Sequence, residues 1–199
     1  MSHITKVEIE VRDLSALITA AENLGLRFMQ GQESFKWYGR FVGDTVPPEG
    51  VDVASFGRCD HALSLVNGGY NAYEVGIVAQ PDGAYGLFWD FYCGGFGLEK
   101  AIGANGSRLI SEYALCAAES AARTQGWYCE RSDNDLLIYH PDGGLIRVDG
   151  SGSVDMSGFS GADCVTAAAP VESALGRNSE RTLKGDYYVR HQSVVVPHE

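Results

Sequence analysis

The fold begins in residues 6–17, which read KVEIEVRDLSAL. Apolar and charged residues alternate as far as Arg12, and a period of two is typical of a strand with one buried face. Asp13 is a natural N-cap, because its carboxylate can accept hydrogen bonds from the first backbone N–H groups of a helix. Apolar residues then recur at helical spacing up to Leu24, and Gly25 is placed to end the helix. The opening of the chain therefore predicts a strand that runs directly into a helix.

Short strands separated by turns rich in Gly, Pro and Asn are expected next. The candidates are residues 26–29, 35–38, 62–66, 73–79 and 85–91. Residues 42–56 are expected to form a loop, and Ser107 to cap a long helix that ends at Gly126. Residues 127–130 and 135–139 follow as strands. This order predicts an α+β fold, an antiparallel sheet with helices packed on one face.

A smaller C-terminal module is expected after the turn at residues 141–144, which reads PDGG. The next apolar segments, at residues 145–148 and 153–156, predict a hairpin. A helix pattern follows from Cys164 to Leu175, and Pro170 is expected to kink it or to start a new helix. Residues 194–196 predict an edge strand or an arm exchanged with a partner.

The chain is therefore expected to contain an α+β domain over residues 1–140 and a small hairpin–helix module over residues 141–199. A module of that size has little core of its own. We expect it to dock on the first domain or on another subunit.

Several blocks carry a resemblance to known families. In the first domain they are the Met-Ser-His start with its Asp-Leu helix, YEVGI at residues 73–77, and SEYA at 111–114 leading to QGW at 125–127. These blocks resemble a domain of unknown function found in a conserved plastid and cyanobacterial open reading frame, although Ile4 stands where that family prefers an aromatic residue.

Residues 141–190 resemble a second, small family of unknown function. Its marks are the Pro-Asp-Gly hairpin, a Gly-Phe-x-Gly-x-x-Cys motif ending at Cys164, ESALG at residues 172–176 and LKGDYY at 183–188. The resemblance implies a fusion of two families whose genes lie near each other and near AAA-type ATPases. It therefore implies an accessory role beside a larger machine.

The net charge of −11 argues against nucleic acid as a partner, because phosphate binding needs clustered Lys and Arg. No apolar run is long enough to span a membrane, and residues 1–12 do not resemble a signal peptide. We therefore expect a cytoplasmic protein without a membrane partner. The five cysteines form no Cys-x-x-Cys pair, so free thiols are expected.

Cys164 is the sharpest candidate for chemistry. A thiol in the first turn of a helix is stabilised as a thiolate by the helix dipole, although the neighbouring Asp163 opposes this. The competing interpretation, which we favour, is a buried cysteine that packs the start of the helix.

Three further residues are weaker ligand-binding candidates. His61 shares a strand face with Cys59, but zinc needs about four donors and no matching pair is present, so no metal is predicted. Gly95 belongs to a Gly-Gly-Phe-Gly turn whose N–H groups could hold a phosphate, yet the turn lacks the P-loop ending. Asp90 flanks this turn, and a carboxylate there would repel an anion. Two aromatic-rich stretches, at residues 37–41 and 88–92, predict a sheet packed on both sides or, if one side is open, a protein or ligand groove.

These observations favour a non-enzymatic accessory or assembly protein that contacts other proteins, with copies of itself or an AAA-type ATPase as partners. No cofactor is predicted. The alternative is a small-molecule-binding protein or an enzyme with Cys164 in its site.

Overall fold

The computed structural model describes residues 3–39, 56–159 and 163–183. The chain divides into two compact units. We call residues 10–116 the middle unit, and residues 1–9 together with 117–199 the terminal unit. Each unit contains one antiparallel sheet and helices, which confirms the α+β class. Helix α3 (Ser107–Thr124) begins in the middle unit and ends in the terminal unit.

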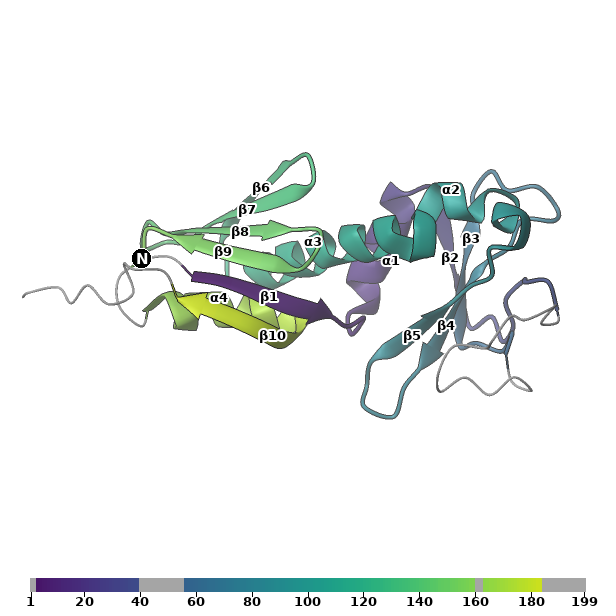
Figure 1. Cartoon of the computed structure of the whole chain (residues 1–199), viewed down its shortest axis with the longest axis horizontal. Coiled ribbons are helices and arrows are strands. Elements are labelled where there is room, and N and C mark those ends of the chain that lie inside the picture. The colour runs from purple at the N-terminus through teal and green to yellow at the C-terminus, as the bar shows by residue number, and fades with distance from the viewer. Residues whose placement is uncertain (1–2, 40–55, 160–162, 184–199) are drawn as a thin grey trace, which may run out of the picture. The chain divides into compact units, whose positions relative to one another are not determined.

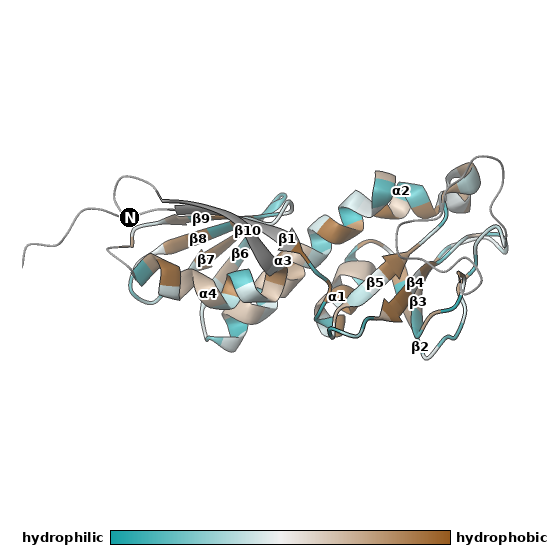
Figure 2. Cartoon of the chain, turned by 60° about the horizontal axis from the view of Figure 1, so that its bottom comes forward, coloured by the Kyte–Doolittle hydropathy of each residue, from teal (hydrophilic) through white to brown (hydrophobic). Residues whose placement is uncertain are grey.

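The sheet of the middle unit has the strand order β2-β3-β4-β5. Its strands are β2 (Leu26–Gln30), β3 (His61–Leu65), β4 (Val75–Ala79) and β5 (Tyr85–Phe88). Around them lie α1 (Leu14–Asn23), the short turns η1 (Tyr92–Gly97) and η2 (Ala104–Gly106), and α2 (Leu98–Ile102). β4 is apolar along nearly its whole length and brown in Figure 2, because it is a central strand whose first three residues are buried.

The start of α1 confirms the predicted cap. The carboxylate of Asp13 accepts hydrogen bonds from Ser15 N at 2.8 Å and Ala16 N at 3.1 Å. The helix buries a stripe of small and apolar side chains, and Gly25 follows it in the left-handed region with φ of +74°. Local chemistry therefore determines both ends of this helix.

The sheet of the terminal unit has the strand order β10-β1-β9-β8-β7-β6, and every neighbouring pair is antiparallel. Its strands are β1 (His3–Ile9), β6 (Tyr128–Ser132), β7 (Asp135–Tyr139), β8 (Leu145–Asp149), β9 (Ser153–Ser157) and β10 (Gly176–Leu183). Figure 1 shows β1, in purple, between β9 and β10. The chain's first strand thus pairs with strands from its last fifty residues.

One face of this sheet forms the core of the terminal unit. Alternate residues of β7, β8 and β9 on that face are fully buried: Leu136, Ile138, Ile146, Val148, Val154 and Met156. Helix α4 (Asp163–Leu175) contacts β1, β9 and β10 and lies on the same side of the sheet as the end of α3 (Figures 1 and 2). The Arg131 side chain of β6 donates to Glu119 of α3 at 3.3 Å. The helices therefore pack on one face, as predicted.

Some sequence expectations differ from the structure. Residues 35–38 form no strand, and only an isolated bridge between Ser34 and Arg58 lies beside them. Residues 73–79 and 85–91 are strands only over Val75–Ala79 and Tyr85–Phe88, because the chain turns at Asp90. The expected strand at residues 194–196 lies outside the described residues.

Pro170 neither ends α4 nor restarts it, and the helix runs continuously across it. A proline removes one helical hydrogen bond and crowds the preceding turn. Burial of α4 side chains on both sides of Pro170, among them Ala167, Ala168 and Val171, stabilises the helix against this cost.

The compact units divide the chain at Ile9/Glu10 and Cys116/Ala117, and a domain boundary near residue 140 stays a prediction. Residue 140 lies in a tight hairpin turn, in which His140 N donates to Gly144 O at 2.8 Å. β7 and β8 pair directly across this turn, so residues 128–139 share a sheet with the expected C-terminal module. Within the described residues, each helix is too short or too polar to cross a membrane.

Replacing Ile138 with alanine should destabilise the protein by about 2–5 kcal/mol, because Ile138 is fully buried in the core of the terminal unit. Its neighbour Leu137 points to the other face and is half-buried. Leu137→Ala is therefore the matched control and should cost roughly 1 kcal/mol or less. Urea unfolding measures both. Equal losses would contradict the assignment of the two faces.

Candidate functional site

The strongest candidate site lies where the chain leaves β5 and turns into η1. Asp90 stands at this corner, and its carboxylate accepts two backbone hydrogen bonds. Tyr92 N donates to one oxygen at 2.8 Å, and Tyr38 N donates to the other at 3.1 Å. Asp90 therefore ties the segment that follows β2 to the turn that follows β5.

The turn itself follows an unusual backbone path. Cys93, Gly94, Gly95 and Phe96 all have left-handed angles, with φ between 51° and 65°. A non-glycine residue in this region costs about 1–2 kcal/mol, and single residues rather than runs normally adopt it. Backbone strain of this kind clusters at functional sites, where the surrounding structure must hold it in place.

Gly95 is held tightly at the centre of the turn. Its carbonyl accepts a hydrogen bond from Tyr73 N at 3.0 Å, and its backbone is buried. A Cβ atom on Gly95 would lie 2.9 Å from Leu98 Cβ and 3.1 Å from the Asp90 carbonyl oxygen. Only glycine fits there. The role of Gly95 is therefore a close approach of the backbone rather than an open phosphate cradle.

Aromatic rings gather around this turn. Tyr38 and Tyr92 lie with ring centroids 4.6 Å apart, and Tyr73 meets Phe96 edge to face at 5.4 Å. Tyr73 is buried, whereas Tyr92 is 51% and Phe96 46% exposed. We call Tyr38, Tyr73, Asp90 and residues 92–97 the aromatic turn.

Two tyrosines of the aromatic turn, Tyr73 and Tyr92, have a pKa raised above the ordinary value of tyrosine. Burial raises the pKa of Tyr73, and the Asp90 carboxylate and the Cys93 thiol raise it further. Cys93 also raises the pKa of Tyr92 through its charge and a side-chain hydrogen bond. The aromatic turn therefore offers the neutral phenol groups of Tyr73 and Tyr92 beside the Asp90 side chain and the exposed Cys93.

A buried carboxylate supports the neighbouring segment. Glu74 precedes β4 and accepts hydrogen bonds from Gln32 Nε2 at 2.8 Å and from Lys36 N at 2.9 Å. Its own backbone N–H donates to Lys36 O at 3.0 Å. A carboxylate can be buried when such bonds satisfy it. Glu74 thus anchors the chain that leads into Tyr38.

His61 and Cys59 lie near the segment that Glu74 anchors, and their contacts are with residues other than Asp90. His61 Nδ1 accepts a hydrogen bond from Gly31 N at 3.0 Å, and its ring lies 5.1 Å from that of Phe28. Cys59 Sγ lies 3.0 Å from Gln32 O. Burial, followed by the charges of Glu74 and Asp60, raises the pKa of Cys59 to about 11. Both side chains have structural partners here.

Cys164 lies in the first turn of α4, in the terminal unit, and is fully buried. The neighbouring Asp163 is exposed. Cys164 therefore belongs to a different unit from His61, Asp90 and Gly95. Across the described ranges, no group of three or more His, Cys, Asp or Glu side chains is arranged to hold a metal ion.

Of the sequence candidates, the structure brings Asp90 and Gly95 into one site. Sequence reasoning missed the support from Tyr73 and Glu74, which comes from hydrogen bonds between distant segments. It also missed Cys93, although the adjacent glycines signalled a tight turn. The identities of Cys93 and Phe96 do not predict their left-handed backbone, because neither residue type favours positive φ.

Comparison with known proteins identifies one region. Residues 145–188 match the model of a family described as protein of unknown function (DUF2997). The match lies wholly within residues 141–190 and agrees with a domain of unknown function there. No curated protein and no solved structure matches the chain. The fusion with a second family at residues 1–140 stays a prediction.

Thiol labelling should distinguish three of the cysteines. At pH 8, iodoacetamide should modify the exposed Cys93 first and Cys59 much more slowly, because the pKa of Cys59 is raised to about 11. The buried Cys164 should react only after unfolding. Peptide mass spectrometry over time measures all three. Rapid labelling of Cys164 in the folded protein would contradict its burial.

Replacing Cys93 with glycine should stabilise the protein by roughly 0.5–1 kcal/mol. This is the difference between about 1–2 kcal/mol of left-handed strain removed and about 0.5–1 kcal/mol of added chain entropy. Cys93→Ser keeps the Cβ atom and is the matched control, with no gain expected. Thermal unfolding measures both variants. A stabilised serine variant would assign the effect to the thiol instead of the backbone.

Proposed function

We propose that this protein is a non-enzymatic accessory or assembly protein that binds a partner protein through the aromatic turn. The observation that carries the proposal is the pair of exposed rings, Tyr92 and Phe96, on a strained and firmly supported backbone. Rigid aromatic side chains dominate binding energy at protein interfaces, because they bury large areas and lose little entropy. The bonds to Asp90 and Gly95 hold this surface in place before binding.

More exposed apolar surface adjoins the aromatic turn. Tyr70 is 93% exposed, and Lys36 Nζ lies over its ring at 5.9 Å. Val66 is exposed directly after β3, and a Cβ atom on Gly97 would lie 3.5 Å from the preceding Leu65. The end of β3, the loop before β4 and η1 therefore meet. Large exposed apolar residues that gather in this way mark interaction sites.

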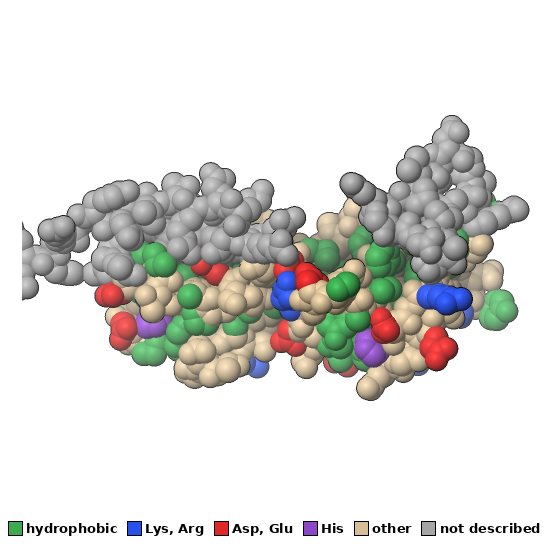
Figure 3. Space-filling model, turned by 90° about the horizontal axis from the view of Figure 1, so that it is seen from below, with side chains coloured by type: hydrophobic (Ala, Val, Ile, Leu, Met, Phe, Trp, Pro, Cys, Tyr) green, Lys and Arg blue, Asp and Glu red, His purple; other side chains and the backbone are tan. Residues whose placement is uncertain are grey.

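Charge favours a protein partner with basic groups around an apolar centre. The chain carries a net charge of −11, and Asp90 adds a carboxylate within the aromatic turn. The face in Figure 3 has no continuous patch of described Lys and Arg side chains. An acidic protein is attracted to basic partners and repelled by phosphate backbones. An AAA-type ATPase is the first partner class to test, because the sequence resemblance implies it.

The alternative, a ligand-binding protein or enzyme that uses Cys164, has no comparable support. A nucleophilic thiol must reach its substrate, and Cys164 has no exposed surface. Cys93 is exposed, but Asp90 already accepts two backbone hydrogen bonds. The histidines His61 and His140 accept hydrogen bonds from the backbone of Gly31 and Asp142. Binding is therefore better supported than catalysis.

The test is affinity capture from the native source with a double variant, Tyr92→Ala with Phe96→Ala. Loss of two central anchors should cost about 2 kcal/mol or more, so recovery of a specific partner should fall roughly 30-fold. Tyr128→Ala is the matched control, because Tyr128 is 67% exposed in the terminal unit. Quantitative mass spectrometry measures recovery, and thermal unfolding checks that each variant is folded.

A partner that binds through the aromatic turn should be lost with the double variant and retained with the Tyr128→Ala control. Undiminished recovery with a folded double variant would overturn the proposal. Recovery that depends on Tyr128 would place the interface on the terminal unit instead.

A further inference from the structure

In the sheet of the terminal unit, the first strand of the chain, β1, lies between two strands from the other end of the chain, β9 and β10. Residues 4–6 of β1 pair with Asp155–Ser153 of β9 on one side and with residues 182–180 of β10 on the other. β9 and β10 flank β1 and are not neighbours of each other in the sheet. Since adjacent strands lie about 4.8 Å apart, removing β1 would leave a slot about 10 Å wide between them.

The slot belongs to the region that matches a family model. Residues 145–188 contain β8, β9, α4 and β10, while β1 comes from the other end of the chain. Helix α4 contacts β9, β1 and β10, so it lines one face of the slot. Two strand edges and a helix therefore form an acceptor, and an extended segment with the backbone of β1 completes it.

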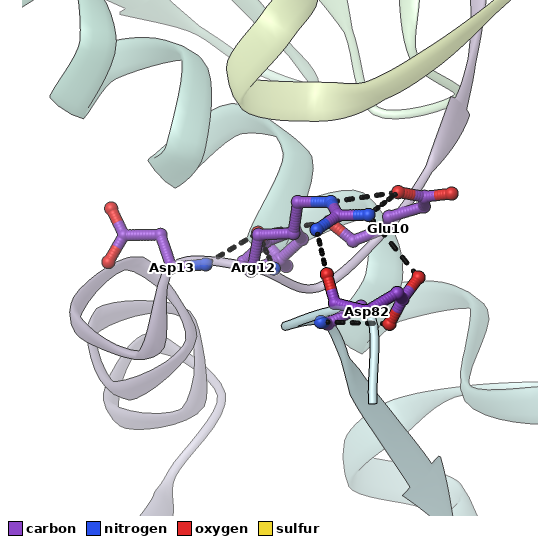
Figure 4. A network of polar contacts seen from close by, with 6 residues as sticks. Glu10, Arg12, Asp13 and Asp82 are labelled. Atoms are coloured by element: carbon purple, nitrogen blue, oxygen red, sulfur yellow. Dashed lines mark hydrogen bonds and ion pairs between the residues drawn. The ribbon is translucent and has the colours of Figure 1, made fainter. Parts of the chain in front are cut away.

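The donor strand is joined to the middle unit by a short, well-anchored segment. Arg12 Nη1 donates to Asp82 O at 2.9 Å, and Arg12 also pairs with the Glu10 carboxylate at 2.8 Å (Figure 4). The Tyr113 hydroxyl accepts from Arg12 N at 2.9 Å and from Asp13 N at 3.2 Å. The same hydroxyl donates to Glu10 O at 3.2 Å.

These contacts place the boundary between the units directly after β1. Residues 10–13 are held within the middle unit, whereas every strand that pairs with β1 belongs to the terminal unit. One chain connection, Ile9 to Glu10, separates the donor strand from the body that carries it.

We propose that this acceptor takes β1 from a second copy of the chain, so that two copies assemble by exchanging their first strands. The exchanged sheet contains the same ladder hydrogen bonds as the single chain. Association therefore changes only the path near Ile9 and costs little besides the entropy of bringing two chains together. The proposal goes beyond the proposed function, takes up the self-association that is expected from the sequence, and is independent of the aromatic turn.

The test uses the full chain with Thr5→Pro and a synthetic peptide of residues 2–12. Thr5 lies where β1 is paired on both sides, and proline cannot take part in a central ladder. Amides of β9 and β10 should exchange at least about tenfold faster in this variant, while those of β3 and β4 keep their protection. Adding the peptide should restore protection in β9 and β10.

Three controls sharpen the peptide test. A peptide that itself carries Thr5→Pro should have no effect, and the normal peptide should leave the unchanged protein unaffected at short times because its acceptor is filled. Thr5→Gly is a milder full-chain variant, since glycine weakens a strand without removing its N–H group. It keeps the test decisive if the proline variant cannot fold its terminal unit.

Exchange between copies is measured by mixing isotope-labelled and unlabelled full-length chains. Native mass spectrometry should detect mixed dimers with the unchanged protein, and none when both chains carry Thr5→Pro. A strictly monomeric unchanged protein, or a peptide that restores protection in neither variant, would overturn the proposal. Neither readout involves Tyr92 or Phe96, so failure here is distinguishable from failure of the aromatic-turn interface.

Discussion

The ladder that β1 forms with β9 and β10 is the interaction on which the terminal unit depends. Residues 3–9 pair with residues 183–176 in an antiparallel register that contains one bulge. Closing this contact costs entropy, because nearly the whole chain forms the intervening loop. Burial of the core beneath β7, β8 and β9, and the packing of α4 across the three strands, provide the compensating free energy. Because β1 pairs with strands from the other end of the chain, the terminal unit is built from both ends of the sequence and the middle unit from the residues between them.

The middle unit uses a different device, in which hydrogen bonds between distant segments hold a strained turn. Four consecutive left-handed residues would not persist in an isolated peptide. Here Asp90 accepts from two backbone N–H groups, and Tyr73 N donates to the carbonyl of Gly95. The result is a rigid corner that keeps Tyr92 and Phe96 exposed. Rigidity matters for recognition, because a surface that is already ordered loses less entropy on binding.

Much of the local structure could be predicted, because its causes are local. The Asp13 cap, the glycine after α1, the long helix α3 and the hairpins from β6 to β9 follow from capping, turn chemistry and periodicity. The strand β10 has no such signal, since its residues 176–181 read GRNSER and show little alternation. It becomes a strand because β1 offers it an edge. Residues 35–38 have a strand-like composition but remain outside the sheet, where Glu74 and Asp90 bind their backbone.

For the candidate site, composition identified the glycine turn, Asp90 and the aromatic stretches, but not their arrangement. Which rings are buried and which are exposed depends on segments more than twenty residues apart, such as Tyr38 with Asp90 and Tyr73 with Gly95. By itself, the sequence determined the α+β class, most helix and strand positions and the acidic character of the chain, because these depend on neighbouring residues and on total charge. Only the tertiary structure decided the division into units, the position of β1 between β9 and β10 and the left-handed path at residues 93–96, because contacts between segments far apart in the sequence set all three.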